Sequence, residues 1–186
     1  MRAYLDTNIL IAYFWSHYFG SDRRETNEIK LIKQGILKEY ELVCSTFSSI
    51  EIYQHFRDYY LLDKVIKSGY GYRGFLRMKS HHEVTETERN RIYEMLDDFE
   101  NQDGINLYKV EKISDDFLFT ITDYIGGDID FFDAIHIRTA IELECNFFVT
   151  RDADLRRRYD QLIKKKIITE PMKITTIKGF LAKLKT

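Results

Sequence analysis

The stretch from Asp128 to Leu155 constrains the fold of this chain more than any other segment. Its first part places apolar residues at roughly helical spacing, at Ile137, Ala140, Ile141 and Leu143. An unbroken apolar run, CNFFVT at 145–150, follows and predicts a short strand buried on both faces. The run stops at Arg151-Asp152-Ala153-Asp154. A carboxylate therefore stands at the carboxyl end of that strand, the edge where open α/β sheets bind ligands.

The rest of the chain repeats this alternation of strands and helices. Strands are expected at 2–6, 41–45, 105–110 and 173–177, with a loop at 20–24 and a break at Pro171. Helices are expected at 9–15, 25–38, 48–63, 85–99 (with Thr85 and Glu88 at the spacing of a capping box), 114–124, 155–168 and 179–184. This order predicts an α/β layer fold with a mainly parallel sheet. The segment from 64 to 84 breaks the rhythm with SGYGYRGFLRMKSHH, which has no clear period and is expected to be a mobile loop or an insertion. We expect one domain over 1–186, with a helical insertion at about residues 64–104.

Composition narrows the class of protein. One Pro and nine Gly argue against long linkers, and Cys44 and Cys145 both lie in apolar runs, as core residues in a reducing compartment do. No apolar run approaches the roughly 18 residues of a membrane span, and the acid at position 6 argues against a signal peptide. We therefore expect a cytoplasmic protein that does not bind a membrane.

Charge is unevenly distributed along the chain. From Arg151 onward the chain has eleven Lys and Arg and four Asp and Glu, a charge of +7. Because the net charge is −2, the first 150 residues carry a charge of −9. A basic tail on an acidic body can present one face to a polyanion while the acids bind cations elsewhere. Solvated helix faces explain the same pattern, and charge alone leaves both readings open.

Four acids follow the predicted strands in matching places: Asp6, Glu51, Asp133 and Asp152. In a parallel sheet all four come to one edge, where converging carboxylates repel each other and lose hydration. A divalent cation relieves this, and oxygen ligands without His or Cys indicate Mg²⁺ or Mn²⁺. Such a site suits phosphodiester hydrolysis by a metal-activated water. The sequence offers no Cys–His or Ser–His pair of comparable spacing for a covalent nucleophile.

Each acid also has a structural explanation. Glu51 follows Ser48 by three residues, as in a capping box, and Asp133 lies in a first helical turn, where an acid complements the helix dipole. Asp152 and Asp154 can cap the next helix, and Asp6 can be a turn residue. The joint occurrence of the four acids favours a shared site.

Four motifs resemble those of PIN domains, in that family's order: LDTNIL at 5–10, SxxE at 48–51, DAIHIRTA at 133–140 and VTRDADL at 149–155. The resemblance implies a three-layer α/β/α nuclease fold and Mg²⁺- or Mn²⁺-dependent cleavage of RNA. It also implies catalytic and metal-binding roles for Asp6, Glu51, Asp133 and Asp152. Asn8 and Thr150 match supporting polar positions, and Asp154 is the expected auxiliary acid. The long gap between the second and third motifs and the chain after the fourth depart from compact members.

Many small PIN proteins resemble VapC-type toxins, which a cognate antitoxin inhibits, so an antitoxin partner is a further expectation.

Candidate RNA contacts mix aromatic and basic residues in the insertion, including Arg73 and Arg77, and continue at Arg156 and Arg157. A helical hairpin packed on the domain or in a homodimer explains the insertion equally well. Two other functions remain to be weighed. One is a non-catalytic RNA-binding or assembly module, and the other is a haloacid-dehalogenase-type phosphatase, which requires an Asp where Asn8 stands.

Overall fold

The computed structural model describes residues 1–19, 26–101, 105–110, 113–169 and 172–184. Contacts group the chain into two compact units, Met1–Ser48 with Asp103–Thr186, and Ser49–Gln102. The expectation of one domain with an insertion at about 64–104 stays a prediction. The loop expected at 20–24 and the break at Pro171 lie outside the described residues.

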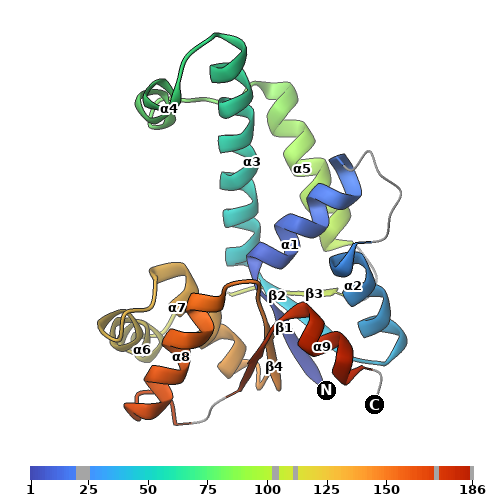
Figure 1. Ribbon diagram of the computed structural model, residues 1–186, viewed down its shortest axis with the longest axis vertical. Coiled ribbons are helices and arrows are strands. Elements are labelled where there is room, and N and C mark those ends of the chain that lie inside the picture. Colours follow the sequence, from blue (N-terminus) through green and yellow to red (C-terminus); the bar gives the residue numbers. More distant parts are fainter. Residues whose placement is uncertain (20–25, 102–104, 111–112, 170–171, 185–186) are drawn as a thin grey trace. The chain divides into compact units, whose positions relative to one another are not determined.

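The first unit is built on a sheet of five parallel strands in the order β3-β2-β1-β4-β5 (Figure 1). These strands are β1 Arg2–Leu5, β2 Glu41–Ser45, β3 Ile105–Tyr108, β4 Phe147–Val149 and β5 Lys173–Thr175. Leu5 pairs with Val149, and Val149 pairs with Thr175, so three strands end side by side. The predicted parallel sheet is confirmed, although β4 is shorter than the apolar run 145–150 suggested.

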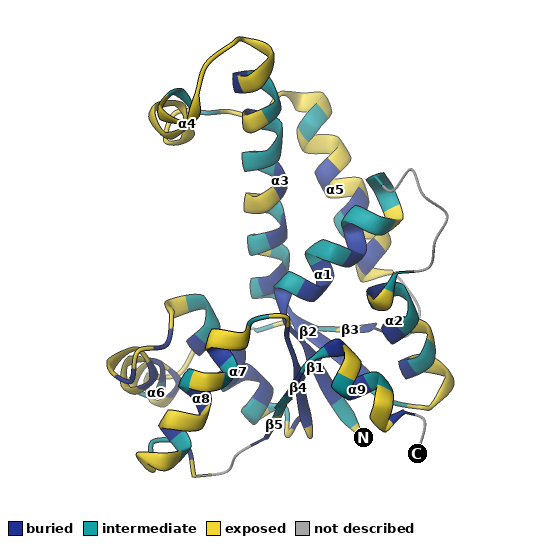
Figure 2. Cartoon of the chain, viewed as in Figure 1, coloured by how far each residue is buried: buried dark blue, intermediate teal, exposed yellow. Residues whose placement is uncertain are grey.

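One face of the sheet is covered by α6 (Asp115–Gly126), α7 (Phe131–Glu142) and α8 (Ala153–Lys164). Successive strand residues point to opposite faces, so Tyr4, Val43 and Phe148 all project to this side and join its buried cluster. The strands and the inner sides of these helices are buried in Figure 2. Burial of this apolar surface is the main force that holds the layer together.

The other face is covered by α2 (Asn27–Leu37) and α9 (Ile177–Lys183), and α1 (Thr7–Phe14) packs on α2. Gly35 brings α2 very close to β2, because a Cβ at this position would lie 2.9 Å from the Leu42 side chain. The rings of Phe147 and Phe180 meet edge to face, with centroids 5.4 Å apart, and fix α9 on β4. α1 continues as a π-helical turn, Trp15–Phe19. Helices on both faces of one sheet confirm the three-layer α/β/α fold.

The second unit contains α4 (Tyr72–Lys79), α5 (Glu86–Glu100) and most of α3 (Thr46–Lys67), whose first residues belong to the first unit. Of the two alternatives for the segment from residue 64, the mobile loop does not fit its helices. α3 runs on to Lys67, and Lys64 Nζ lies 3.0 Å from Glu88 Oε2, which ties the end of α3 to the start of α5. The capping box predicted for α5 is confirmed, since Thr85 Oγ1 accepts from Glu88 N and Glu88 Oε2 accepts from Thr85 N. α4 buries none of its residues.

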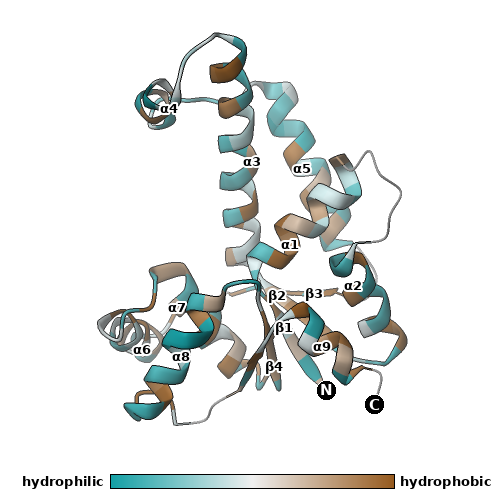
Figure 3. Cartoon of the chain, in the orientation of Figure 1, coloured by the Kyte–Doolittle hydropathy of each residue, from teal (hydrophilic) through white to brown (hydrophobic). Residues whose placement is uncertain are grey.

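Figure 3 shows hydrophilic residues along α3 and α8. In the part of the chain that the structure describes, no helix is both long enough and apolar enough to span a membrane.

Candidate functional site

Asp6 follows the last residue of β1 and occupies the N-cap position of α1. Only 4% of its surface is exposed. An acid at this position usually accepts a bond from the first helical turn, but the Asp6 side chain makes no such cap. Instead its Oδ2 accepts hydrogen bonds from Asn8 Nδ2 and Thr150 Oγ1, each at 2.5 Å. The carboxylate is therefore held by one side chain of its own helix, Asn8, and by one that follows β4, Thr150.

Thr150 is at the centre of this polar cluster because β1 and β4 end in register. Asp6 N donates to Val149 O at 3.0 Å, which continues the pairing of Leu5 with Val149 by one step. Besides donating to Asp6, Thr150 Oγ1 accepts from Asn8 Nδ2 at 3.0 Å and from Asp152 N at 2.9 Å. The two positions that matched supporting polar residues, Asn8 and Thr150, thus link Asp6 to the loop that carries Asp152.

Asp152 caps α8, as one of its structural explanations predicted. Its Oδ1 accepts from Asp154 N at 2.7 Å and from Leu155 N at 2.9 Å. Both bonds use the same oxygen, so Oδ2 does not take part in the cap. Asp154 Oδ1 lies 3.0 Å from Arg157 NH2 on the exposed side of α8. This ion pair directs Asp154 along its own helix, and an auxiliary role for it stays a prediction.

Asp133 lies in the first turn of α7, whose N-cap is Asp130. The pKa of Asp133 is raised to about 7, first by burial and then by the charges of Asp6, Asp130 and Asp152, whereas His136 lowers it. The first cause is desolvation, which penalises the ionised form, and the second is repulsion between like charges. Asp6, Asp133 and Asp152 are therefore close enough to interact electrostatically at one edge of the sheet.

The chemistry of these side chains fits a hard divalent cation, because every donor is a carboxylate or another oxygen. Among the described residues, however, no three His, Cys, Asp or Glu side chains are drawn together as a preformed metal site. The Oδ2 of Asp6 and the Oδ1 of Asp152 are both engaged in hydrogen bonds within the protein. Mg²⁺ binds through one or two carboxylates and keeps several waters, so an open set of this kind is compatible with it.

Glu51 is not at the start of its helix. α3 begins at Thr46, directly after β2, so Ser48 is not an N-cap and the capping-box explanation was wrong. Glu51 lies one turn further on and belongs to the second unit. Its place beside the other three acids stays a prediction.

The basic residues expected to bind substrate divide between the units. Arg156 and Arg157 lie on α8, one half-buried and one exposed, whereas Arg73 and Arg77 are exposed on α4. Their contact with RNA stays a prediction.

Two buried polar features near these acids were not anticipated. Glu28 of α2 is 3% exposed and forms an ion pair with Arg151, whose backbone N donates to Asn8 Oδ1 at 3.1 Å. His136 of α7 is 1% exposed and bonds to residues of β1 and α1. In the sequence, a single His among apolar helix residues indicates that His136 is buried, whereas nothing indicates that Glu28 is buried.

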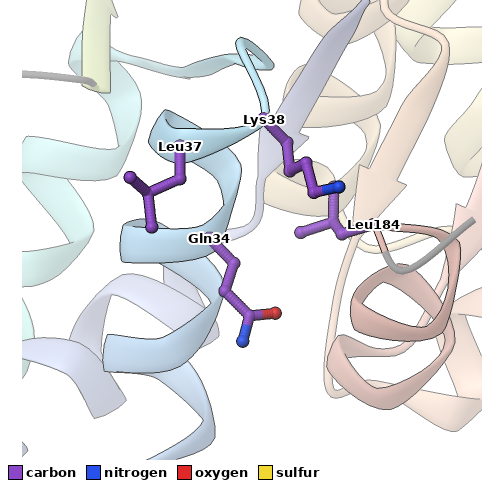
Figure 4. Close-up of a pocket in the computed structure, with 4 residues that line it drawn as sticks. All are labelled: Gln34, Leu37, Lys38 and Leu184. Carbon is purple, nitrogen blue, oxygen red and sulfur yellow. The ribbon is translucent and has the colours of Figure 1, made fainter.

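A surface pocket of about 320 Å³ lies elsewhere on the first unit (Figure 4). Its lining residues, Gln34, Leu37, Lys38 and Leu184, belong to the ends of α2 and α9. α2 ends just before β2 begins, so the pocket lies toward the amino ends of the strands and not at the edge that carries Asp6.

The sequence matches the PIN domain over residues 3–161. No curated protein matches it. Among solved structures, the chain is similar to VapBC2 from Rickettsia felis bound to a DNA fragment from its promoter, with a TM-score of 0.52 and 12% identity. That likeness covers 95% of this chain and 98% of the other, and at such low identity it establishes the fold alone. The profile match spans most of the residues, and the chain therefore belongs to the PIN-domain family, whose members are generally nucleases.

Proposed function

We propose that this protein is an endoribonuclease that hydrolyses RNA phosphodiester bonds with Mg²⁺ or Mn²⁺. The observation that carries the proposal is the gathering of Asp6, Asp133 and Asp152 at the carboxyl edge of the sheet. Burial and, after it, the charges of Asp6, Asp130 and Asp152 raise the pKa of Asp133 to about 7. Without a cation this arrangement destabilises the fold, so the residues support a cation-binding role better than a structural one.

In this proposal Asp6, Glu51, Asp133 and Asp152 hold the metal and are the catalytic acids. The bound metal supplies charge neutralisation for the phosphate and an acidified water as nucleophile. Asn8 and Thr150 orient the Asp6 carboxylate through their 2.5 Å bonds to Oδ2. Arg156 and Arg157 begin the basic helix that follows Asp152, where they contact the RNA backbone. Arg73 and Arg77 of α4 are further RNA contacts in this proposal.

We further propose that the protein is the toxin of a toxin–antitoxin pair acting in the cytoplasm. The fold is shared with VapBC2 of Rickettsia felis, which supports a cognate antitoxin as the partner. A small gene for a DNA-binding protein beside the coding sequence would support this role. Co-expression of that protein should relieve growth arrest and block cleavage in vitro. Cleavage that persists with the neighbouring protein bound contradicts the toxin role but leaves the nuclease proposal intact.

The direct test uses structured and unstructured RNAs with Mn²⁺ or Mg²⁺, followed by mapping of the cleaved ends. Asp6→Asn and Asp133→Asn keep side-chain shape and remove charge, so each should lower cleavage by at least about 100-fold, since electrostatic groups at a reacting phosphate supply effects of this size. Asp160→Asn, on the exposed side of α8, is the matched control and should cleave normally. RNA binding without cleavage at any metal concentration would instead support the non-catalytic module.

A further inference from the structure

A chain of four buried side chains runs through the first unit behind the acids. Ser45 Oγ lies 2.8 Å from Tyr4 OH, which lies 2.7 Å from His136 Nδ1. The other ring nitrogen, His136 Nε2, lies 3.2 Å from Thr7 Oγ1. All four residues are at most 4% exposed. The chain therefore joins β2, β1, α7 and α1 through the dry interior of the unit.

Such a chain specifies geometry rather than adding much net stability. A buried hydroxyl or imidazole left without a partner costs about 1–3 kcal/mol, so each member holds its neighbours in one arrangement. Both nitrogens of His136 are engaged, and the ring cannot rotate without breaking a bond at each end. Tyr4 is fixed in addition by stacking on Phe148, with centroids 5.3 Å apart.

The Tyr4 hydroxyl can donate to one neighbour and accept from the other, so it contacts Ser45 Oγ and His136 Nδ1 at once. The Thr7 hydroxyl can likewise donate to His136 Nε2 or accept from it.

His136 and its partner Thr7 each lie close in sequence to a proposed catalytic acid. Thr7 is the first residue of α1 and follows Asp6 directly. His136 lies three residues after Asp133, which places both on one side of α7. The bond from His136 to Thr7 therefore joins the segment that carries Asp6 to the segment that carries Asp133.

We propose that His136 is a positioning residue that sets the spacing of Asp6 and Asp133 by bridging Tyr4 and Thr7 through its two ring nitrogens. The proposal rests on the nuclease function stated above. His136 touches neither substrate nor metal. Its effect is to keep the two carboxylates at the separation that the reaction requires. A displacement of about 1 Å between reacting groups can lower a rate by about 100-fold.

Three substitutions of His136 separate its two contacts. In His136→Gln the side-chain amide should take the place of Nε2 and keep the bond to Thr7. In His136→Asn the shorter amide should take the place of Nδ1 and keep only the bond to Tyr4. His136→Leu removes both. We expect kcat of the Gln variant to stay within about threefold of wild type, and kcat of the Asn and Leu variants to fall about 10- to 100-fold with little change in KM.

A matched control separates positioning from general stability. Tyr159 is also buried in the first unit, and its hydroxyl bonds to Met172 N at 3.0 Å, away from the acids. Tyr159→Phe should lower the melting temperature while leaving kcat unchanged. Should His136→Leu fail to fold, Thr7→Val removes the same bond with little change of shape, and Thr7→Ser restores the hydroxyl. Equal kcat losses in the Gln, Asn and Leu variants, or no loss in any of them, would overturn the proposal.

Nuclear magnetic resonance of the metal-free protein gives a second readout that does not depend on catalysis. The backbone amides of Asp6 and Asp133 should shift in His136→Leu and stay near their wild-type positions in His136→Gln. If wild type cleaves no RNA, the nuclease function fails, yet these amide shifts still decide whether His136 sets the spacing of the two acids.

Discussion

Asp133→Asn should make the metal-free protein more stable at alkaline pH. The folded pKa of about 7 lies roughly 3 units above the ordinary value of 3.8, which corresponds to about 4 kcal/mol at 1.36 kcal/mol per unit. Asp133 is only half-buried and solvent screens part of the repulsion, so about 2 kcal/mol is a better expectation. For a chain of this length that corresponds to a rise of about 4–8 °C in Tm.

The sign of this effect changes with pH in a defined way. A carboxyl whose pKa is raised on folding binds its proton more tightly in the folded state, so the protein loses stability as pH rises from about 4 through about 7. Below pH 4 the Asp133 carboxyl is protonated in both the folded and the unfolded protein, so its replacement by Asn removes no charge and should not change stability. The stabilisation by Asn should therefore be largest above pH 8 and should shrink toward acid pH.

The assay is thermal unfolding in EDTA at pH 4.5 and pH 8.5, with Asp160→Asn as the exposed control on α8. Mn²⁺ should raise the Tm of wild type at pH 8.5 and raise that of Asp133→Asn much less, because the cation relieves the same repulsion. An Asn variant that gains no stability at pH 8.5, or gains as much at pH 4.5, would refute the argument that burial and the neighbouring acids disfavour the ionised form of Asp133.

Three shorter predictions concern the surroundings of the acids. Arg151→Met should lower the free energy of unfolding by about 1–3 kcal/mol, because it leaves the buried Glu28 carboxylate unpaired, and Glu28→Gln in the same chain should recover part of the loss in urea unfolding. Thr150→Val removes the donor to Asp6 Oδ2 and should lower kcat by about 10-fold or more in the RNA cleavage assay, whereas Thr150→Ser should retain most of it. Arg156→Ala with Arg157→Ala should weaken RNA binding equally across sequences and make log Kd less dependent on log salt in filter-binding titrations, whereas an unchanged salt slope would exclude these side chains as phosphate contacts.

Much of the fold could be predicted from the sequence because its strands are short apolar runs that end on polar residues. Asp6 and Asp152 each follow such a run, and parallel pairing alone brings them to one edge. Asn8 and Thr150, by contrast, were expected only from the resemblance to PIN domains, and both proved to bind the Asp6 carboxylate. The pairing of β1 with β4 brings Thr150 to Asp6.

Features that depend on the start of a helix or on long-range packing were harder to predict. Ser48 and Glu51 have the spacing of a capping box, yet α3 begins at Thr46 because the chain leaves β2 without an intervening loop. The segment after residue 64 lacks a clear period, so apolar spacing gave no sign that α3 continues to Lys67. The partner of the buried Glu28 is Arg151, more than a hundred positions later, so nothing near Glu28 in the sequence marks the pair.

The side-by-side ending of β1 and β4 has a consequence for how this protein is made. Asp6 and Thr150 are separated by 144 positions and become neighbours only through the pairing of these two strands. A ribosome has therefore to synthesise more than three quarters of the polypeptide before the Asp6 carboxylate receives its main support. Products of interrupted translation that end before Phe147 lack β4. We expect these products to have no RNA cleavage activity.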